Sequence, residues 1–475
     1  MKTEKTSVGE LKERSGFSGS LGFILAAAGS AVGLGNIWRF PYCAAEGGGG
    51  LFLLIYIILV VVFGYVLLST DISIGRKTGM SSINAYGSMN KKWKFVGVLA
   101  FIVPSIIITY YIVIGGWIFH YAASYITMSG DTIAQDGYFT SFISSGAAPI
   151  VFMLIYLAVN AVIVMLGVEK GIERFSKFIM VALIALIVFI AVYSVTITHT
   201  DESGVTRTGL DGLAVYFIPN FDGLTLSGFA EILMNAISQM FFSLSIAMGI
   251  MVTYGSYVKK EVNLSKSVKQ ICIFDSAVAI LAGMIIVPAV FVFFGMDGMT
   301  AGTGLMFVTL PKVFQAMGGF GPVIAIMFFI MVAFAAITSS VSILEAIVAN
   351  AMEVFHKTRK QVCLVVIAVA AAVAVIVCLG FNVLYAEIPL PAGGTGQILD
   401  VLDYMSNDIL MPFIALFTCI LIGWVLKPSW VTGEMEASGH KLGAKGLFSV
   451  MLKFVGPALM VILILNALGV FNKIG

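Results

Sequence analysis

The stretch GSAVGLGNIWRFPY, residues 29–42, lies inside an apolar run that begins at Leu21. Its glycines, its proline and the cap-favouring Asn36 all disfavour a continuous helix. It also contains Arg39, although a charge inside a bilayer-spanning segment is costly. The stretch therefore predicts a membrane helix that is interrupted at its middle and charged near its end.

The composition indicates that lipid surrounds most of the chain. Of the 475 residues, 59% are hydrophobic and 11% are charged, and a soluble protein of this size could not bury that much apolar surface. A membrane span needs about 20 apolar residues. Eleven segments meet this requirement, near residues 21–42, 51–70, 95–122, 149–167, 173–195, 228–255, 271–294, 321–350, 361–382, 397–426 and 448–471. We therefore expect an all-α polytopic membrane protein with eleven transmembrane helices.

The distribution of basic residues supports this topology. If the N-terminus is cytoplasmic, 23 of the 27 lysines and arginines lie in cytoplasmic segments, and the rest are Arg39, Arg207, Lys312 and Lys473. Such a bias is the positive-inside pattern of membrane proteins. It predicts a cytoplasmic N-terminus and a C-terminus outside. The five cysteines are scattered in or beside apolar segments and are expected to be core residues.

A second span, at FFSLSIAMGIM (241–251), has the same kind of interruption as the first. The two lie five spans apart and so run in opposite directions, and such a pair indicates an inverted-repeat transporter. The alternative is that the glycines only allow close helix packing. The expected organisation is a cytoplasmic segment (1–20), a first repeat (21–195), an extracellular loop (196–227), a second repeat (228–426), a cytoplasmic linker (427–447) and a final helix with the C-terminus (448–475).

Two connecting segments have their own signatures. TLPKVFQAMGG, residues 309–319, predicts a short amphipathic helix outside the membrane, whereas residues 427–446 predict a plain polar linker.

A broken helix offers N–H groups that attract a carboxylate and C=O groups that attract a cation. Further oxygen ligands lie in AAITSSVSILE, residues 335–345, although hydroxyls in membrane helices often bond back to their own helix. These candidates are Thr338, Ser339, Ser342 and Glu345. Oxygen ligands without a cluster of carboxylates favour a monovalent cation. We therefore expect a site for a zwitterion together with a small cation.

Charged residues inside the predicted spans are few, and each is a functional candidate because charge in hydrocarbon is costly. They are Arg39, Asp275, Glu345, Asp400 and Asp403. For Arg39 and Asp403, a structural ion pair is the alternative, and such a pair is compatible with a gate.

These motifs resemble the signature of the neurotransmitter:sodium symporters, in particular their bacterial amino-acid transporters. The similar segments are residues 29–42, EGGGG (46–50), SQMFFSLSIAMGIMVTYGSY (238–257), AAITSSVSILE (335–345) and LDYMSNDILMP (402–412). The resemblance implies the LeuT fold, which is a 5+5 inverted repeat with unwound first and sixth helices, here with one additional C-terminal helix. It also implies sodium-coupled import of an amino acid through the bacterial inner membrane. The transporter would be a monomer or weak oligomer in the lipid bilayer and would bind no nucleic acid.

The resemblance implies two sodium ions. The first would be bound by the Ala31 carbonyl, Asn36, Ser243, Asp275 and the carboxylate of the substrate. The second would be bound by the carbonyls of Gly29, Val32 and Ala335 and the hydroxyls of Thr338 and Ser339.

The resemblance also implies a substrate pocket and two gates. Tyr111 and the backbone near Gly33 and Gly35 would hold the substrate carboxylate. The rest of the pocket would comprise Ser30, Ile107, Ile114, Phe242, Ser245, Ala247, Met248, Ser339 and Ile343. The outer gate would be Arg39 with Asp403, aided by Gln239. The inner gate would be Arg14 with Glu353, near Tyr257.

Departures from the family pattern refine these expectations. Asp275 aligns either with a sodium ligand or with the position where a carboxylate replaces chloride, and both alternatives predict chloride independence. Phe17 stands where a tryptophan often braces the inner gate. Gly171 is followed ten residues later by Val181 rather than proline, which puts the unwinding of the fifth helix in doubt.

The implied pocket contains no charge, so we expect a neutral, apolar amino acid. Ala247, where many members have glycine, favours aliphatic substrates, whereas the adaptable Met248 leaves the identity open. One alternative is a receptor that binds without transport, and another is coupling to protons through Glu345 or Asp275. An enzyme is not expected, because the four histidines are dispersed and no nucleophile–base pairing is visible.

Overall fold

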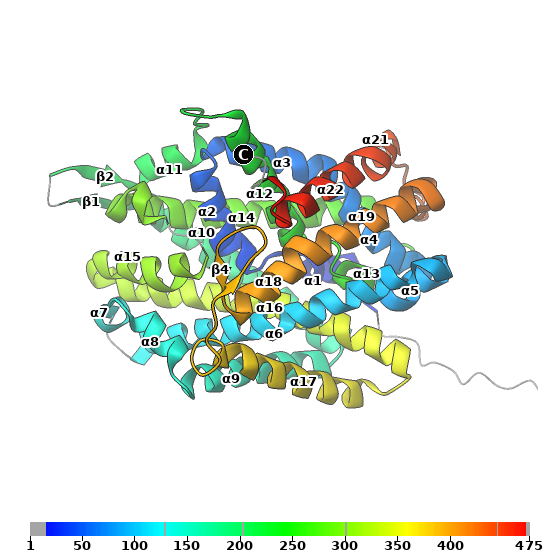
Figure 1. Cartoon of the computed structure of the whole chain (residues 1–475), viewed down its shortest axis with the longest axis horizontal. Coiled ribbons are helices and arrows are strands. Elements are labelled where there is room, and N and C mark those ends of the chain that lie inside the picture. Colours follow the sequence, from blue (N-terminus) through cyan, green and yellow to red (C-terminus); the bar gives the residue numbers. More distant parts are fainter. Residues whose placement is uncertain (1–15, 128–129, 202–203, 300–301, 444, 472–475) are drawn as a thin grey trace, which may run out of the picture.

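The structure is a computed structural model that describes residues 16–127, 130–201, 204–299, 302–443 and 445–471. Within these ranges it is nearly all helical, and the long helices lie side by side (Figure 1). Two short antiparallel hairpins interrupt the helical pattern. They are β1 (Thr198–Thr200) with β2 (Thr206–Thr208), and β3 (Ile388–Pro389) with β4 (Thr395–Gly396).

Nine helical segments in the described residues are long and apolar enough to cross a membrane. They are Gly50–Thr78 (containing α3, Gly50–Leu59, and α4, Tyr65–Thr78), Lys91–Thr127 (with α6, Lys94–Thr127), Ala148–Met165 (α9), Val168–Thr196 (with α10, Arg174–Thr196), Leu264–Phe294 (α14), Gly318–Phe355 (with α16, Gly321–Phe355), Arg359–Leu379 (α17), Ile398–Val425 (with α18, Ile398–Asp403, and α19, Met411–Ile420) and Lys445–Ala467 (with α21, Lys445–Val450, and α22, Gly456–Ala467).

The two remaining predicted spans are helical but broken. The first consists of α1 (Ser20–Ala31) and a second half, Gly35–Glu46, that ends in α2 (Phe40–Glu46), with a bend of 56° between the halves. The other consists of α12 (Leu226–Ser243) and α13 (Ile250–Ser256), separated by the non-helical residues 244–249. All eleven predicted segments are thus helical, with both breaks where the sequence predicts them. The fifth segment has no such break, and α10 continues through Val181.

Shorter elements gather at the two ends of the bundle. Figure 1 places the β1–β2 hairpin, α7 (Gly130–Ile133), α8 (Tyr138–Ser144) and α15 at one end, and α5 (Ser82–Met89) and α13 at the other. Another short helix, α11 (Gly209–Phe217), follows the hairpin. The amphipathic helix predicted at 309–319 is confirmed as α15 (Leu310–Ala316).

The prediction of a plain polar linker at 427–446 is wrong. This segment forms α20 (Ser429–Met435), whose Val431 and Met435 are buried. The spacing of these two residues places both on one face of the helix. Glu434, on the same short helix, accepts a hydrogen bond from the buried Arg76 of α4, with 2.8 Å between Nε and Oε1. The sequence conceals this packing because the polar residues around these positions outnumber the apolar ones.

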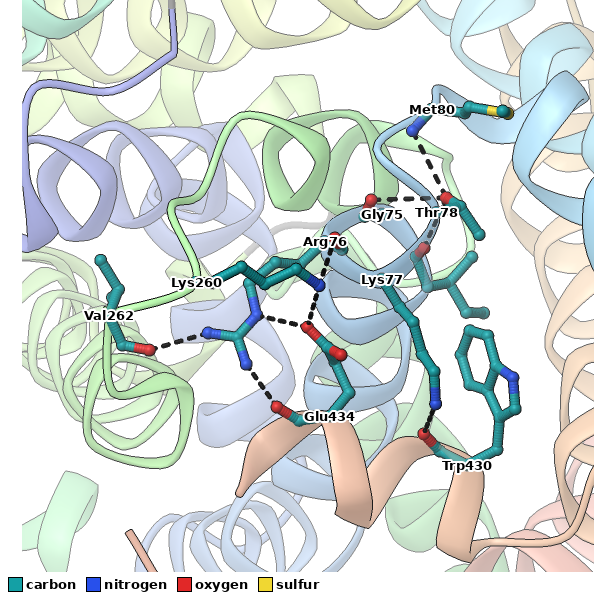
Figure 2. Close-up of polar contacts among 10 residues, drawn as sticks. Gly75, Arg76, Lys77, Thr78, Met80, Lys260, Val262, Trp430 and Glu434 are labelled. Atoms are coloured by element: carbon teal, nitrogen blue, oxygen red, sulfur yellow. Dashed lines mark hydrogen bonds and ion pairs between the residues drawn. The ribbon is translucent and has the colours of Figure 1, made fainter. Parts of the chain in front are cut away.

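The ion pair between Arg76 and Glu434 is the centre of a network (Figure 2). Lys260 Nζ lies 2.8 Å from the same Glu434 oxygen, and Arg76 Nη1 donates to the Val262 carbonyl at 2.7 Å. Lys77 donates to the Trp430 carbonyl at 2.9 Å and lies over the Trp430 ring. These contacts tie α20 to α4 and to the segment that precedes α14.

Helices at the centre of the bundle surround the two breaks. The long helices α6 and α16 pack along each other, and α1 packs against α14 and α16. The breaks at 32–34 and 244–249 are therefore enclosed by continuous helices. All five cysteines are buried and free, as expected.

Candidate functional site

The first break is fixed by close approaches that only glycine permits. A Cβ at Gly33 would lie 2.7 Å from Ser339 Oγ, and one at Gly35 would lie 2.5 Å from a ring carbon of Phe242. Asn36 stabilises the turn, because its Oδ1 accepts a hydrogen bond from the Gly33 N–H at 3.0 Å. The half-helix that begins at Gly35 presents its first N–H groups here, where the helix dipole favours an anion.

The second break contains left-handed backbone at two residues that are not glycine. Ser245 has φ of 52° and Ala247 has φ of 62°, and the cost of this conformation for an L-residue is about 1–2 kcal/mol. Asp71 of α4 is buried beside it and accepts a hydrogen bond from the Ala247 N–H at 3.0 Å. Backbone strain of this kind is concentrated at functional sites.

The two breaks contact each other directly. Ser245 Oγ donates to the Ser30 carbonyl at 3.2 Å, and the two hydroxyl oxygens lie 3.4 Å apart. One site is therefore built from both interrupted helices.

Three of the residues expected at the first sodium site meet at one carboxylate. Asn36 Nδ2 lies 2.7 Å from Asp275 Oδ1, and Ser243 Oγ lies 2.8 and 2.9 Å from the two carboxylate oxygens. Tyr56, which the sequence did not indicate, donates to Asp275 Oδ2 at 3.3 Å. Asn36, Ser243 and Asp275 are almost completely buried, and the Ala31 residue lies on the adjoining cavity wall.

The five residues expected at the second sodium site also lie together. Ser339 Oγ is within 3.4 Å of the Gly29 carbonyl and 3.1 Å of the Val32 carbonyl, and it also bonds the Ser30 carbonyl. Thr338 Oγ1 donates to the Ala335 carbonyl at 3.0 Å. A Cβ at Gly29 would lie 3.3 Å from Thr338 Cβ, so α1 and α16 are in contact here. Carbonyl and hydroxyl oxygens suit a hard monovalent cation.

The other candidate ligands of this helix lie elsewhere. Ser342 bonds the Thr338 carbonyl of its own helix and accepts from Tyr254, and Glu345 is engaged with Tyr257 and Arg359. The described residues contain no group of three or more His, Cys, Asp or Glu side chains that could hold a metal.

A cavity of about 20 Å³ lies between the breaks, α6 and α16. Ten of the twelve residues expected to bind substrate line it, namely Ser30, Gly33, Gly35, Ile107, Tyr111, Phe242, Ser245, Met248, Ser339 and Ile343. Ile114 and Ala247 do not. Leu34 and Ile250, which the sequence analysis did not single out, do. Because ligand pockets usually measure about 300–1,000 Å³, the walls must separate to admit an amino acid.

The hydroxyl of Tyr111 is the polar group of the cavity wall that most directly indicates a bound ligand. Its hydroxyl is buried and has no hydrogen-bond partner among the described residues. The oxygen lies 3.2 Å from where a Cβ on Gly33 would stand, so it points at the first break. An unpaired buried hydroxyl costs about 1–3 kcal/mol, and a substrate carboxylate would satisfy it.

The two residues expected to form the outer gate are described, but no ion pair joins them. Arg39 and Asp403 both lie in the described part of the chain, and they make no ion pair with each other there. Asp403 accepts from Asn407 Nδ2 at 2.6 Å, while Gln239 donates to the Gly35 carbonyl at 3.0 Å. The side-chain oxygen of Gln239 has no partner within the described ranges.

At the opposite end, Arg14 lies outside the described residues. Its expected partner Glu353 accepts from the N–H of Ser81 at 2.8 Å, and from Asn84. Tyr257 donates to Glu345 at 2.7 Å, and Glu345 pairs with Arg359. Phe17 is buried and packs against Tyr254 and Tyr257, where the resemblance places a bracing aromatic.

The sequence analysis missed Asp71 and Tyr56. Asp71 stands one residue beyond the predicted end of the second span, whereas the helix continues to Thr78. A carboxylate at that position of an apolar helix was the available signal. Nothing in the sequence around Tyr56 indicates a role, because its hydroxyl contacts Asp275 only in the folded structure.

Comparisons with known proteins found similarity over most of the chain. The profile of the Sodium:neurotransmitter symporter family matches residues 14–131 and 139–474. The chain is 32% identical over 463 residues to the sodium-dependent transporter YhdH of Bacillus subtilis, covering 96% of this chain and 98% of that protein. It is 30% identical over 433 residues to the sodium-dependent transporter MJ1319 of Methanocaldococcus jannaschii, covering 87% and 82% respectively. The structure is similar to that of MhsT in complex with L-phenylalanine, with a TM-score of 0.83, 33% identity and coverage of 96% and 100%.

Proposed function

This chain belongs to the sodium:neurotransmitter symporter family and is a sodium-dependent membrane transporter, not an enzyme; from this premise we propose that it imports neutral, apolar amino acids by alternating access without chloride. The observation that carries the proposal is the meeting of both broken helices around one buried carboxylate and one unpaired tyrosine hydroxyl.

The cavity walls support a neutral, apolar side chain. Among the described residues no charged side chain lines the cavity, and its apolar wall is formed by Ile107, Phe242, Met248, Ile250 and Ile343. A charged substrate side chain would lose its hydration here without gaining a partner. The similar MhsT is in complex with L-phenylalanine, which has such a side chain. Because Ala247 does not line this cavity, the proposal covers both aliphatic and aromatic side chains.

Two sodium ions are proposed, one at each oxygen cluster. The first would lie among Ala31, Asn36, Ser243 and Asp275, with the substrate carboxylate completing its shell. The second would lie among Gly29, Val32, Ala335, Thr338 and Ser339, where it would join α1 to α16. Asp275 supplies a fixed negative charge beside the first ion, so a mobile chloride is not needed.

The proposed mechanism couples these sites to the gates. Sodium and the amino acid raise each other's affinity by the same factor, because the coupling of two ligands is reciprocal. Their binding draws the cavity walls together and brings Arg39 to Asp403. Release of the second ion then loosens α1 from α16 and opens the cytoplasmic side. The driving energy is the sodium gradient plus about 2.3 kcal/mol per charge for each 100 mV.

Uptake of radiolabelled leucine into proteoliposomes tests this proposal. Sodium is replaced by potassium in one arm and chloride by gluconate in another, and unlabelled amino acids compete in a third. We expect accumulation that requires sodium, ignores chloride, and is blocked by apolar but not by charged amino acids.

Two other outcomes would contradict the proposal. Sodium-dependent binding without accumulation would identify a receptor. Uptake driven by a pH gradient without sodium would identify proton coupling, with Asp275 and Glu345 as the carboxylates to test.

A further inference from the structure

A groove of about 850 Å³ lies between α6, α16 and α17, outside the candidate site. Its walls include Phe355, Val365 and Val369, which are 64%, 64% and 58% exposed. The groove therefore opens toward the surrounding membrane rather than toward the interior of the bundle.

The groove has almost no polar character along its length. Its two wall hydroxyls, Ser105 and Thr109, donate to carbonyls of their own helix, each at 2.7 Å. Neither hydroxyl therefore needs a ligand partner, and the occupant that matches the apolar part of the groove is a hydrocarbon chain.

One end of the groove is cationic. Lys357 lines this end and is exposed, and the neighbouring Lys360 is exposed as well. Gln361 also lines it, and because its side-chain oxygen accepts from Thr358, its amide N–H groups are left as donors. Two acids of α16 are engaged with other groups: Glu345 pairs with Arg359, and Glu353 accepts from Ser81 and Asn84.

We propose that this groove binds one acyl chain of an anionic membrane phospholipid whose phosphate lies at Lys357. Basic pockets between transmembrane helices on the cytoplasmic side bind anionic headgroups in this way, and the basic-residue distribution assigns this end to the cytoplasm. A zwitterionic lipid would fill the same apolar walls but would gain less from the cationic end.

The groove shares its helices with the candidate site. Ile108 lines the groove next to Ile107 of the cavity, and Ile347 lies one turn from Ile343 on α16. Leu402 of the groove precedes the gate residue Asp403. A bound chain therefore packs on the reverse side of the helices that must move during transport.

Brominated lipids test the proposal, because bromine quenches a nearby tryptophan. Val369→Trp places a reporter in the groove, with Val365→Trp as a second reporter should the first fail to fold. Val192→Trp on α10, where the valine is 62% exposed, is the matched reporter outside the groove. Each protein is reconstituted in phosphatidylcholine vesicles with a minority of phosphatidylglycerol, with bromine on the chains of one lipid or the other. The spectrum of the parent chain is subtracted.

The groove reporter should be quenched by brominated phosphatidylglycerol about fivefold beyond the share of that lipid in the vesicle, which corresponds to ~1 kcal/mol for one surface cation. Lys357→Gln should abolish this excess, whereas Lys266→Gln, an exposed lysine at the start of α14, should preserve it. The Val192→Trp reporter should show none.

Three results would overturn the proposal: quenching in proportion to lipid composition, an excess that survives in Lys357→Gln, or no quenching by either lipid. The last result, together with cross-linked dimers through α17, would identify a second copy of the chain as the occupant.

Discussion

Ser243 donates a hydrogen bond toward the carboxylate of Asp275, with its oxygen 2.8 and 2.9 Å from the two carboxylate oxygens, although the residues belong to different helices. Asn36, from the other broken helix, approaches the same carboxylate at 2.7 Å. A negative charge is thus held between the two breaks. Its loss should affect the cation more than the apolar part of the substrate.

Asp275→Asn should raise the sodium concentration for half-maximal uptake at least tenfold, which corresponds to about 1.4 kcal/mol. The variant keeps the shape of the side chain but removes the charge that faces sodium. Chloride should begin to stimulate uptake, because a mobile anion can replace the lost charge. The measurement is uptake against sodium concentration with and without chloride, with Asp400→Asn in the first turn of α18 as the control. An unchanged sodium dependence in Asp275→Asn would remove the first ion from this position.

Ser339→Ala should also weaken sodium dependence about tenfold, because the Ser339 hydroxyl contacts the Gly29 and Val32 carbonyls of the first break. The control is Ser340→Ala on the same helix, since Ser340 bonds Asn160 and carbonyls of its own helix instead. Sodium titration of uptake distinguishes the two variants. Equal effects of both variants would indicate a general defect of α16 rather than an ion site.

Tyr111→Phe should weaken substrate binding about tenfold to a hundredfold, the range expected for a hydrogen bond to a charged group. The change should raise stability by up to about 1–3 kcal/mol, since it removes a buried hydroxyl that has no partner among the described residues. Tyr110→Phe is the matched control, because Asn407 donates to the Tyr110 hydroxyl at 3.3 Å and neither group lines the cavity. Equilibrium binding of a radiolabelled amino acid provides the readout. If Tyr111→Phe bound substrate as tightly as the parent, the carboxylate would have to be held elsewhere.

Ala247→Gly should raise the melting temperature slightly, because glycine removes the strain of a left-handed alanine. The gain should be at most about 1 kcal/mol, since glycine also adds freedom to the unfolded chain. Substrate selectivity should stay the same, because Ala247 does not line the cavity. Thermal unfolding in detergent and competition between leucine and phenylalanine test both statements. A shift toward larger substrates would show that the Ala247 methyl limits the pocket after all.

Glu434→Gln should destabilise the protein by about 3–5 kcal/mol, because it leaves the buried Arg76 guanidinium without its counter-charge. Glu436→Gln is the control on the same linker, where the partly exposed carboxylate pairs with the exposed Lys445 at 2.7 Å. Exposed pairs of this kind contribute little. Thermal unfolding in detergent is the measurement, and equal melting temperatures of the two variants would contradict a structural role for the α20 contact.

The sequence predicts the breaks well because glycine, proline and asparagine act locally. The hydroxyls of Thr338 and Ser339 were candidate oxygen ligands from the same kind of local signal, whereas their assignment to the second ion site rests on the resemblance. Tyr56 could not be predicted, because its role arises only when α3 packs against α14. Asp71 was missed because the predicted span ended one residue before it, although the helix continues to Thr78. The α20 contact was missed because a buried arginine partner for Glu434 lies far away in sequence.

For the gates, the sequence indicates candidate residues but not whether they are in contact. A motif identifies Arg39 and Asp403 as partners, but whether they touch depends on which conformation the helices adopt. Likewise, the resemblance assigns Ala247 to the pocket by position alone, whereas Ala247 is not among the residues that line the cavity.

The most direct test of the central claim is the affinity for a neutral amino acid measured at increasing sodium concentration, in parallel with its carboxamide analogue. If sodium and the substrate carboxylate share one shell, sodium should raise the affinity for the amino acid strongly and that for the amide hardly at all. Asp275→Asn should reduce this sodium effect. An amino acid that binds equally well in potassium, or an amide that shows the same sodium dependence, would contradict the shared site.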